Sequence, residues 1–310
     1  MSERLIQATH TLVAKFQRQR PVRSGSLLVT MFGDAIAPRG GTVTLGSLIR
    51  LAEPFGIPER LVRTSVGRLA QEGWLEFRRS GRQSEYFLTA HGKNRFAEAT
   101  QRIYAAAPPS WDGHWTLIFM PPGPRPRRER IRDEMAWLGF GQIGADVLAH
   151  PSRSAADTRS QLAELHLDGG AVILRAASEG PDGDQGLLQA GWDLAELARS
   201  YQRFVATFEP LQTLLAGRAE ATPDTAFVIR TLLIHQYRKI HLRDPLLPHS
   251  LLPDDWIGAR AYELCRDLYR RVFTAAEQHI SATAETLDSK LTAPARETYK
   301  RFGGLDAASR

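Results

Sequence analysis

One predicted helix in this 310-residue chain concentrates side chains suited to binding a polyanion. Apolar residues recur at helical spacing from residue 57 to residue 71 and would face a core; they are Leu61, Val62, Val66 and Leu69. The opposite face carries Arg60, Arg63, Thr64, Gly67 and Gln71, with Arg68 beside it. Guanidinium, hydroxyl and amide groups bind phosphates and base edges, so this face predicts a helix that lies in a DNA groove.

A short β-hairpin with a basic tip is expected directly after this helix. Residues 74–77 and 86–88 are typical of two strands, and the segment between them begins Arg78-Arg79-Ser80-Gly81-Arg82. A helix followed by a basic hairpin predicts a winged helix-turn-helix, with the hairpin tip on the DNA backbone or in the minor groove. The predicted DNA-binding residues are Arg60, Arg63, Thr64, Ser65, Arg68, Arg79, Arg82 and Gln83; for Ser65 an inward-facing position stays open.

The elements around this motif complete an expected DNA-binding domain over residues 25–107. We expect helices at 26–32, ending near Gly33-Asp34, at 44–52 and at 91–104. Residues 1–24 are basic and would form an arm or a leading helix. Charge is distributed accordingly, because residues 1–108 hold 16 Lys and Arg against 8 Asp and Glu, while the remainder holds 24 against 26. A basic N-terminal third is typical of a nucleic-acid-binding module joined to other domains.

A small α+β domain is predicted over residues 110–178. Its expected elements are a strand at 115–120, a helix at 125–138, one or two strands at 143–149, a helix at 157–165 and a strand at 171–175. The order β-α-β(β)-α-β predicts a ferredoxin-like domain. Such domains have edge strands that pair readily, so we expect homodimerisation here.

The remaining segment, 186–310, is predicted to be an all-helical domain with long helices at 192–208, 224–240 and 257–279. Residues 105–109 and 178–186 are candidate linkers, and the polar tail after Ser281 is expected to be less ordered. The chain as a whole is thus predicted to be a multidomain α+β protein.

Polar and aromatic side chains are dense between residues 233 and 256. The residues of interest are His235, Tyr237, Arg238, Lys239, Arg243, Asp244 and Trp256, with His241 and Asp255 nearby. Three interpretations stay open: a network that braces loops, a pocket for a phosphorylated aromatic ligand, or a metal site. No established ligand spacing is present, so we predict no metal.

Catalysis has little support in the sequence. Residues 139–144 match GxGxxG, but they follow a predicted helix and lead into a strand, whereas a dinucleotide site follows a strand and opens a helix. We interpret these glycines as a helix stop and expect no cofactor. The single cysteine, Cys265, lies on an apolar helical stretch and is expected in a core. Without a signal-peptide pattern or a membrane-spanning apolar run, the chain is expected to be cytoplasmic.

The chain also resembles the PaaX-like family of repressors of phenylacetate-degradation operons over nearly its whole length. The resemblance is carried by SLLVTMFGDAIAPRGGTVTLGSLIRLAEPFGI, VRTSVGRLAQEGWL, GRQSEYFLT, LGFG and, most specifically, LIHQYRKIHLRDPLLPHSLLPDDW. It implies a winged-helix domain, a ferredoxin-like domain and a helical effector domain. It also implies a dimer that binds operator DNA and is released by phenylacetyl-CoA.

The expectation from sequence is therefore a non-enzymatic repressor of phenylacetate catabolic genes. Its effector contacts are proposed among the seven residues named between 235 and 256. The alternative is an enzyme that acts on an acyl-CoA or another small molecule and uses the winged helix to bind a protein.

Overall fold

The computed structural model describes residues 3–19, 24–105, 110–167, 169–217 and 220–305. These residues divide into two compact units, and each is described by itself. Unit 1 combines the described parts of 1–106, 203–239 and 259–310, and unit 2 combines those of 107–202 and 240–258. The N-terminal elements therefore share one unit with most of the C-terminal helices, a grouping that no local sequence pattern indicates. The domain limits expected from the sequence stay predictions.

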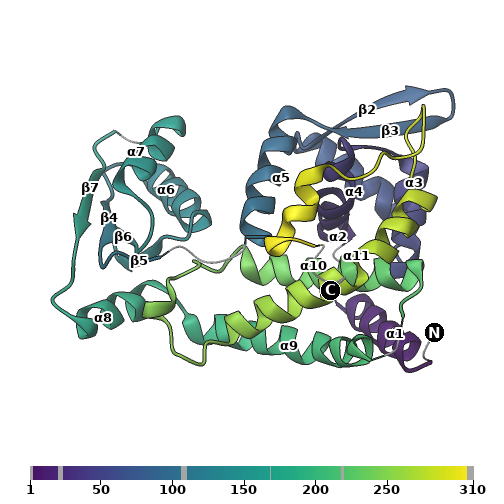
Figure 1. The fold of residues 1–310 in the computed structure, drawn as a ribbon. Coiled ribbons are helices and arrows are strands. Elements are labelled where there is room, and N and C mark those ends of the chain that lie inside the picture. The colour runs from purple at the N-terminus through teal and green to yellow at the C-terminus, as the bar shows by residue number, and fades with distance from the viewer. Residues whose placement is uncertain (1–2, 20–23, 106–109, 168, 218–219, 306–310) are drawn as a thin grey trace. The chain divides into compact units, whose positions relative to one another are not determined.

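In unit 1 the N-terminal elements are α1 (Glu3–Gln17), α2 (Ser24–Met31), α3 (Leu45–Ala52), α4 (Glu59–Gln71) and α5 (Ala90–Ile103) (Figure 1). Three antiparallel strands, β1 (Thr42–Thr44), β2 (Leu75–Ser80) and β3 (Gln83–Leu88), form a sheet in the order β1-β3-β2. Val62, Val66 and Leu69 of α4 are buried, as their helical spacing predicts, and α4 contacts both α2 and α3.

One local expectation is wrong in this region, and one short strand was not expected. The first core helix does not end at Gly33-Asp34; it continues as a π-helical turn, η1 (Phe32–Ile36), and a 3-10 turn, η2 (Ala37–Arg39). A π-turn shifts side chains relative to an α-helix and is often found at functional sites. In addition, residues 42–44 form a strand before α3. Thr44 then caps that helix by accepting a hydrogen bond from Ser47 N at 3.3 Å.

Unit 2 contains a four-stranded sheet of β4 (Trp115–Phe119), β5 (Gly141–Gly144), β6 (Val147–His150) and β7 (Val172–Ala176). The strand order is β5-β6-β4-β7 with every neighbouring pair antiparallel, and α6 (Arg125–Trp137) and α7 (Ala155–Glu164) occupy the two crossovers. This is the β-α-β-β-α-β arrangement that the sequence predicts. The GxGxxG segment follows α6 and enters β5, and Gly139 has a positive φ of 94°, so these glycines are a helix stop as expected.

A further helix, α8 (Pro181–Gly191), contacts β5 and β6. The interpretation of residues 178–186 as a linker is therefore wrong from residue 181 onward. Proline at the first turn and two acidic residues there, Asp182 and Asp184, suit a helix start. Asp184 also accepts a hydrogen bond from Trp115 Nε1 at 2.8 Å, which fixes this helix start to β4.

The C-terminal helices are α9 (Leu194–Ala216), α10 (Pro223–His241) and α11 (Ile257–Thr283), with short 3-10 turns η4 (His249–Leu251) and η5 (Arg296–Gly303). Both units include parts of these helices. The expectation of a less ordered tail is wrong for residues 284–305. Four residues of this tail are buried in unit 1: Leu291, Arg301, Phe302 and Leu305. The polar composition of the tail gave no indication of this burial.

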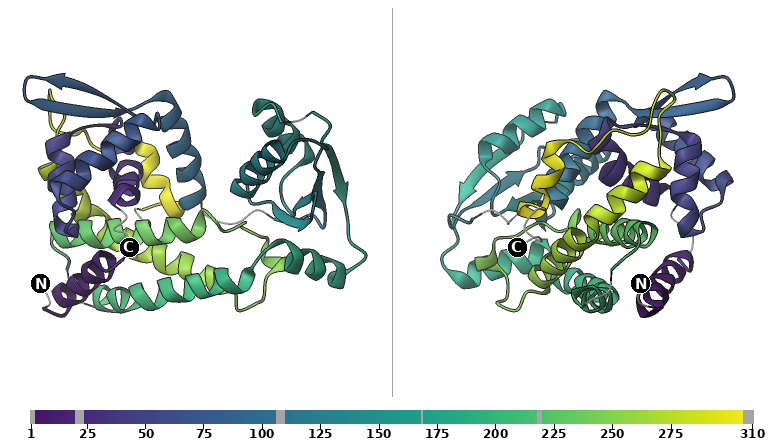
Figure 2. Two further views of the ribbon diagram at one scale, coloured as in Figure 1. Left: turned by 180° about the vertical axis from the view of Figure 1, so that it is seen from behind. Right: turned by 45° about the vertical axis from the view of Figure 1, so that its right-hand side comes forward.

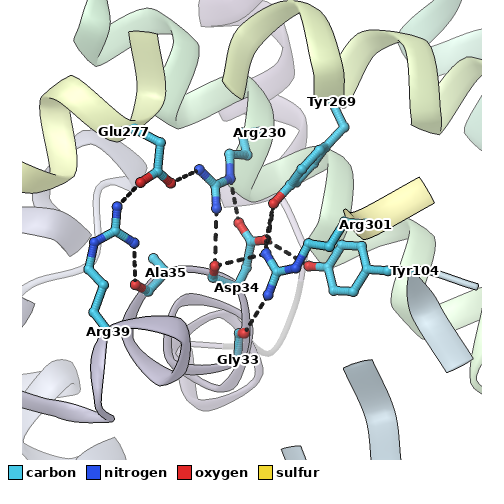
Figure 3. A network of polar contacts seen from close by, with 9 residues as sticks. All are labelled: Gly33, Asp34, Ala35, Arg39, Tyr104, Arg230, Tyr269, Glu277 and Arg301. Atoms are coloured by element: carbon cyan, nitrogen blue, oxygen red, sulfur yellow. Dashed lines mark hydrogen bonds and ion pairs between the residues drawn. The ribbon is translucent and has the colours of Figure 1, made fainter. Parts of the chain in front are cut away.

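A buried ionic network ties the segments of unit 1 together around Asp34 of η1 (Figure 3). Asp34 accepts hydrogen bonds from Arg230 Nε at 2.7 Å, Arg301 Nη1 at 2.8 Å, Tyr104 Oη at 2.6 Å and Tyr269 Oη at 2.8 Å. Arg230 also binds Glu277, which in turn pairs with Arg39. One carboxylate thus joins η1, the end of α5, α10, α11 and the tail.

Burial by itself would raise the pKa of Asp34. The charges of Arg230 and Arg301 and the hydrogen bonds from Arg230 and Tyr104 outweigh burial, so the pKa is lowered. Burial raises the pKa of Tyr104 well above its ordinary value and that of Tyr269 to about 12, so both phenols stay protonated and donate to the carboxylate. Asp34 therefore remains ionised wherever the protein is folded near neutral pH.

We expect Asp34→Asn to destabilise the protein by roughly 3–5 kcal/mol, because it leaves buried guanidinium groups without their central partner. A lowered pKa makes the stabilisation by Asp34 complete above the unfolded-state value of about 3.9 and lost as pH falls through the folded-state value. The difference between wild type and variant should therefore shrink below about pH 4. Urea unfolding between pH 3 and pH 7 measures this; Glu263→Gln, at an exposed site of α11, should change stability by less than about 0.5 kcal/mol.

Candidate nucleic-acid interface

The solvent-facing side of α4 presents the residues that the sequence predicts to contact DNA. Arg60, Arg63, Thr64 and Arg68 are all exposed. Ser65 faces inward, which is the alternative left open for it: its side chain is buried, and its Oγ lies 3.1 Å from Ser24 Oγ. The amphipathic pattern thus positions this basic face, because burial of the apolar side leaves the arginines in solvent.

Two arginines of this face have acidic neighbours one helical turn away. Arg63 Nη2 lies 2.6 Å from Glu59, and Arg68 Nε lies 3.4 Å from Glu72. All four side chains are about half exposed, and such surface pairs contribute only ~0–1 kcal/mol each. An anionic group can therefore replace the carboxylate at little energetic cost.

The hairpin is longer than predicted. Arg78 and Arg79 lie within β2, and only Gly81 and Arg82 separate the two strands; Gly81 has a positive φ of 57°, as a tight turn requires. Arg82 at the turn and Gln83 beside it are exposed, and the Arg79 guanidinium lies 5.9 Å from the ring of Phe77. The predicted hairpin residues thus occupy the distal half of the hairpin.

Residues from the helix and the hairpin meet at one surface hollow. A cavity of about 190 Å³ is lined by Arg63 of α4, by Arg82 and Gln83 of the hairpin, and by Arg50 of α3. Arg50 was not among the predicted residues, because it is an ordinary basic residue in a short amphipathic helix. The hollow brings together three arginine side chains from three different elements, and Glu285, which pairs with Arg50, also lines it.

A segment that sequence analysis missed holds the hairpin and α3. We call residues 284–291, directly after α11, the strap; it runs beside β2 and β3 in Figure 1 and in both views of Figure 2. Leu287 N donates to Glu85 Oε1 at 2.7 Å, and Asp288 binds Arg78 Nη2 at 2.8 Å. Glu285 binds Arg50 at 3.0 Å. The signal available in the sequence was Glu85 itself, an acidic residue within a basic hairpin.

The predicted effector residues do not form one cluster within a single unit. Four of them lie in unit 1. His235 and Tyr237 are fully buried, and His235 Nδ1 lies 3.0 Å from Thr30 Oγ1. Arg238 donates to Thr30 Oγ1 at 2.7 Å and to Ser26 O at 2.6 Å, and burial lowers its pKa to about 10. Lys239 is half-buried. Arg238 therefore anchors α2 to α10.

The other three lie in unit 2. Asp244 is buried and accepts a hydrogen bond from Tyr201 Oη at 2.6 Å, and the same hydroxyl lies 3.2 Å from His241 Nδ1. The Trp256 ring packs edge-on against Tyr201, with centroids 6.4 Å apart, and Arg243 is exposed. Among the residues that the structure describes, no group of three or more His, Cys, Asp or Glu side chains is arranged to hold a metal ion.

Cys265 is buried in α11, as predicted, and burial raises the pKa of its thiol well above the ordinary value. A thiol that resists ionisation is a poor nucleophile. Within the described ranges, no helix has both the length and the apolar character needed to cross a membrane.

Fold and surface together define a multidomain α+β protein that carries a basic helix and hairpin on one unit. Three family models match the chain: PaaX-like protein over residues 23–92, PaaX protein central Cas2-like domain over 108–188, and PaaX-like protein C-terminal domain over 192–282. The Transcriptional repressor PaaX of Escherichia coli (strain K12) is 38% identical over 290 residues, which is 92% of this chain and 92% of the relative. The chain belongs to the PaaX-like family.

Among solved structures, the uncharacterized protein Rv0674 from Mycobacterium tuberculosis is similar over 74% of this chain and 89% of its own. The sequence identity is 21% and the TM-score 0.45. This likeness is too remote to support any argument about function.

We expect Glu85→Ala to release the strap from the hairpin, because the buried carboxylate binds both Leu287 N and Arg78. Loss of hydrogen bonds to a charged acceptor should destabilise the protein by about 1.5–3 kcal/mol. Hydrogen–deuterium exchange should become faster in residues 75–88 and 284–291 together. Glu76→Ala, at an exposed position of the same hairpin, is the matched control; equal exchange in the two variants would show that Glu85 does not hold the strap.

Proposed function

We propose that the chain is a transcriptional repressor of phenylacetate catabolic genes that binds operator DNA through unit 1 and is released by phenylacetyl-CoA. The observation that carries this proposal is the hollow at which Arg63 of the helix and Arg82 of the hairpin meet. The relationship to the Escherichia coli repressor supports it, and supports a regulator over an enzyme. A repressor acts on the chromosome, so the cytoplasm is the proposed location.

The geometry of unit 1 supports a winged helix-turn-helix. A single-turn 3-10 helix, η3 (Glu53–Phe55), and Gly56 with a positive φ of 67° join α3 to α4. This is the short glycine-containing turn of a helix-turn-helix. The antiparallel β2–β3 pair that follows α4 supplies the wing. In this arrangement α4 is the element that enters the major groove.

We assign roles to the exposed residues from their positions. Arg60, Arg63, Thr64 and Arg68 on α4 face base edges and phosphates, and Arg79, Arg82 and Gln83 hold the hairpin on the backbone. Ser65 supports α4 from within through its contact with Ser24. Arg50 joins the phosphate contacts, because it lines the same hollow as Arg63 and Arg82.

The sheet of unit 2 supports homodimerisation. Phe119, Val172 and Leu174 are 40%, 52% and 46% exposed. Phe119 pairs with Val172 and Leu117 pairs with Leu174, so these side chains form one apolar stripe along β4 and the edge strand β7. Exposed apolar stripes on an edge strand mark an interaction surface, and a two-fold axis would place the stripe against its own copy.

For the effector we propose an acyl-CoA, and the seven residues between 235 and 256 remain its candidate contacts. Arg243 is exposed and Trp256 half-buried, so a ligand reaches them without disturbing the core. His235 and Arg238 would respond indirectly, because they already brace α10 against α2. Tyr237 would do the same through its ring contact with Phe204 of α9. A ligand shifts DNA binding only through different affinities for the bound and released states.

We expect Arg63→Ala to weaken binding to a duplex selected by the wild-type protein by roughly 1–3 kcal/mol, because a bidentate contact to guanine is lost. Arg82→Ala should instead reduce the slope of log K against log salt by about 0.9, the effect of one phosphate contact. Fluorescence anisotropy titrations between 50 and 200 mM salt measure both the affinity and its salt dependence. The Debye length is about 10 Å at 0.1 M salt, so contacts with phosphates respond over this range.

Arg159→Ala, which removes the same charge from an exposed site on α7, is the control and should leave both quantities unchanged. Equal losses in all three variants would mean that only net charge matters. Salt-independent binding of the wild-type protein to random duplex would instead favour the alternative, an enzyme that uses the helix and hairpin to bind a protein.

We expect Leu174→Glu to convert the dimer to monomer, because it buries a carboxylate in the apolar stripe of both copies. Light scattering coupled to size-exclusion chromatography measures the mass. Arg175→Glu, at an exposed position next to it on β7, should leave the dimer intact. A dimer that persists in Leu174→Glu would place the interface elsewhere.

A further inference from the structure

A second hollow in unit 1 lies next to the buried ionic network. It has a volume of about 390 Å³, within the range of small-molecule sites. Its wall includes Pro38 of η2, Leu88 of β3, Phe96 and Ala97 of α5, and Arg301 of the tail. These residues come from four separate segments, and the tail lies against the end of α5, since Phe302 N donates to Tyr104 O at 3.0 Å.

The network beside this hollow carries more positive than negative charge. Arg39, Arg230 and Arg301 form one connected set with two carboxylates, Asp34 and Glu277. The two tyrosines in the set remain neutral, because burial raises the pKa of both. One guanidinium charge therefore lacks a carboxylate within the set, and an uncompensated buried charge is costly.

Arg301 connects the network to the hollow, because it belongs to both. It is 5% exposed, and its Nε is buried without a hydrogen-bond partner among the described residues, as is that of Arg39. At the rim, Lys93 and Glu297 are both exposed, so their opposite charges offset each other. The unbalanced positive charge of the network would be stabilised by an anion bound in the hollow.

We propose that this hollow binds an organic anion whose apolar body packs on Leu88, Phe96 and Pro38 and whose charged end is bound by Arg301. The hollow contains none of the candidate effector contacts between residues 235 and 256, so it is a second site; its effect on DNA rests on the proposed function. Leu88 is the last residue of β3, and its N donates to Gly41 O at 3.0 Å. An occupant thus contacts the base of the hairpin that carries Arg79 and Arg82, and so links a small molecule to the DNA-facing surface.

The same chemistry can come from a free aromatic carboxylate or from the phosphorylated end of a CoA ester. Titration calorimetry of the full chain with phenylacetate, phenylacetyl-CoA and CoA distinguishes them. We expect Ala97→Trp, which fills the hollow from its exposed wall, to weaken binding of the preferred probe at least tenfold. Glu98→Trp, the neighbouring exposed position that does not line the hollow, should leave affinity unchanged.

Lys93→Gln provides a second variant, because it alters the rim without adding volume; we expect a several-fold loss of affinity for the anion at low salt.

Calorimetry needs no DNA, so a protein that binds a probe in the hollow but no duplex would refute the repressor function and not the site. Binding of none of the three probes, or equal binding by wild type and Ala97→Trp, would overturn the proposed site while leaving DNA binding untouched.

Discussion

Unit 1 depends on one buried carboxylate. Asp34 accepts four hydrogen bonds, from Arg230, Arg301, Tyr104 and Tyr269, and so joins segments that lie far apart in the sequence. A charge buried without such partners would be prohibitively costly, so each segment must be in place for the others to be stable. Asp34 lies within the π-turn at residues 32–36, so this turn is the segment that presents the carboxylate to the network.

This constraint makes the C-terminal elements part of the unit that carries the basic helix and hairpin. α11 contributes Tyr269 and Glu277 to the network and then continues into the strap, which binds Glu85 and Arg78 of the hairpin. A change in α11 can therefore reach the hairpin through covalent continuity and a few charged contacts. A two-state shift in such contacts is the physical means by which a ligand would alter DNA affinity.

Two surfaces of opposite character serve the proposed repressor. On unit 1, Arg63 and Arg68 of α4 form only weak surface ion pairs, so an anionic partner can displace the carboxylates. On unit 2, the apolar stripe on β4 and β7 is what remains of the sheet face after α8 covers β5 and β6. Membership in the PaaX-like family joins these surfaces in one regulator.

The sequence by itself determined what depends on local periodicity. The spacing of Val62, Val66 and Leu69 predicted which side of α4 is exposed. Apolar patterns and turn residues predicted the hairpin and the succession of strands and helices along unit 2. Tertiary structure alone decided that Ser65 turns inward, that residues 284–305 are ordered, and that Arg301 lies beside Asp34. The position of Arg301 depends on pairing between charges more than 260 positions apart, for which a polar tail gives no periodic signal. Burial of a charge is decided by its partners, and only the folded chain brings them together.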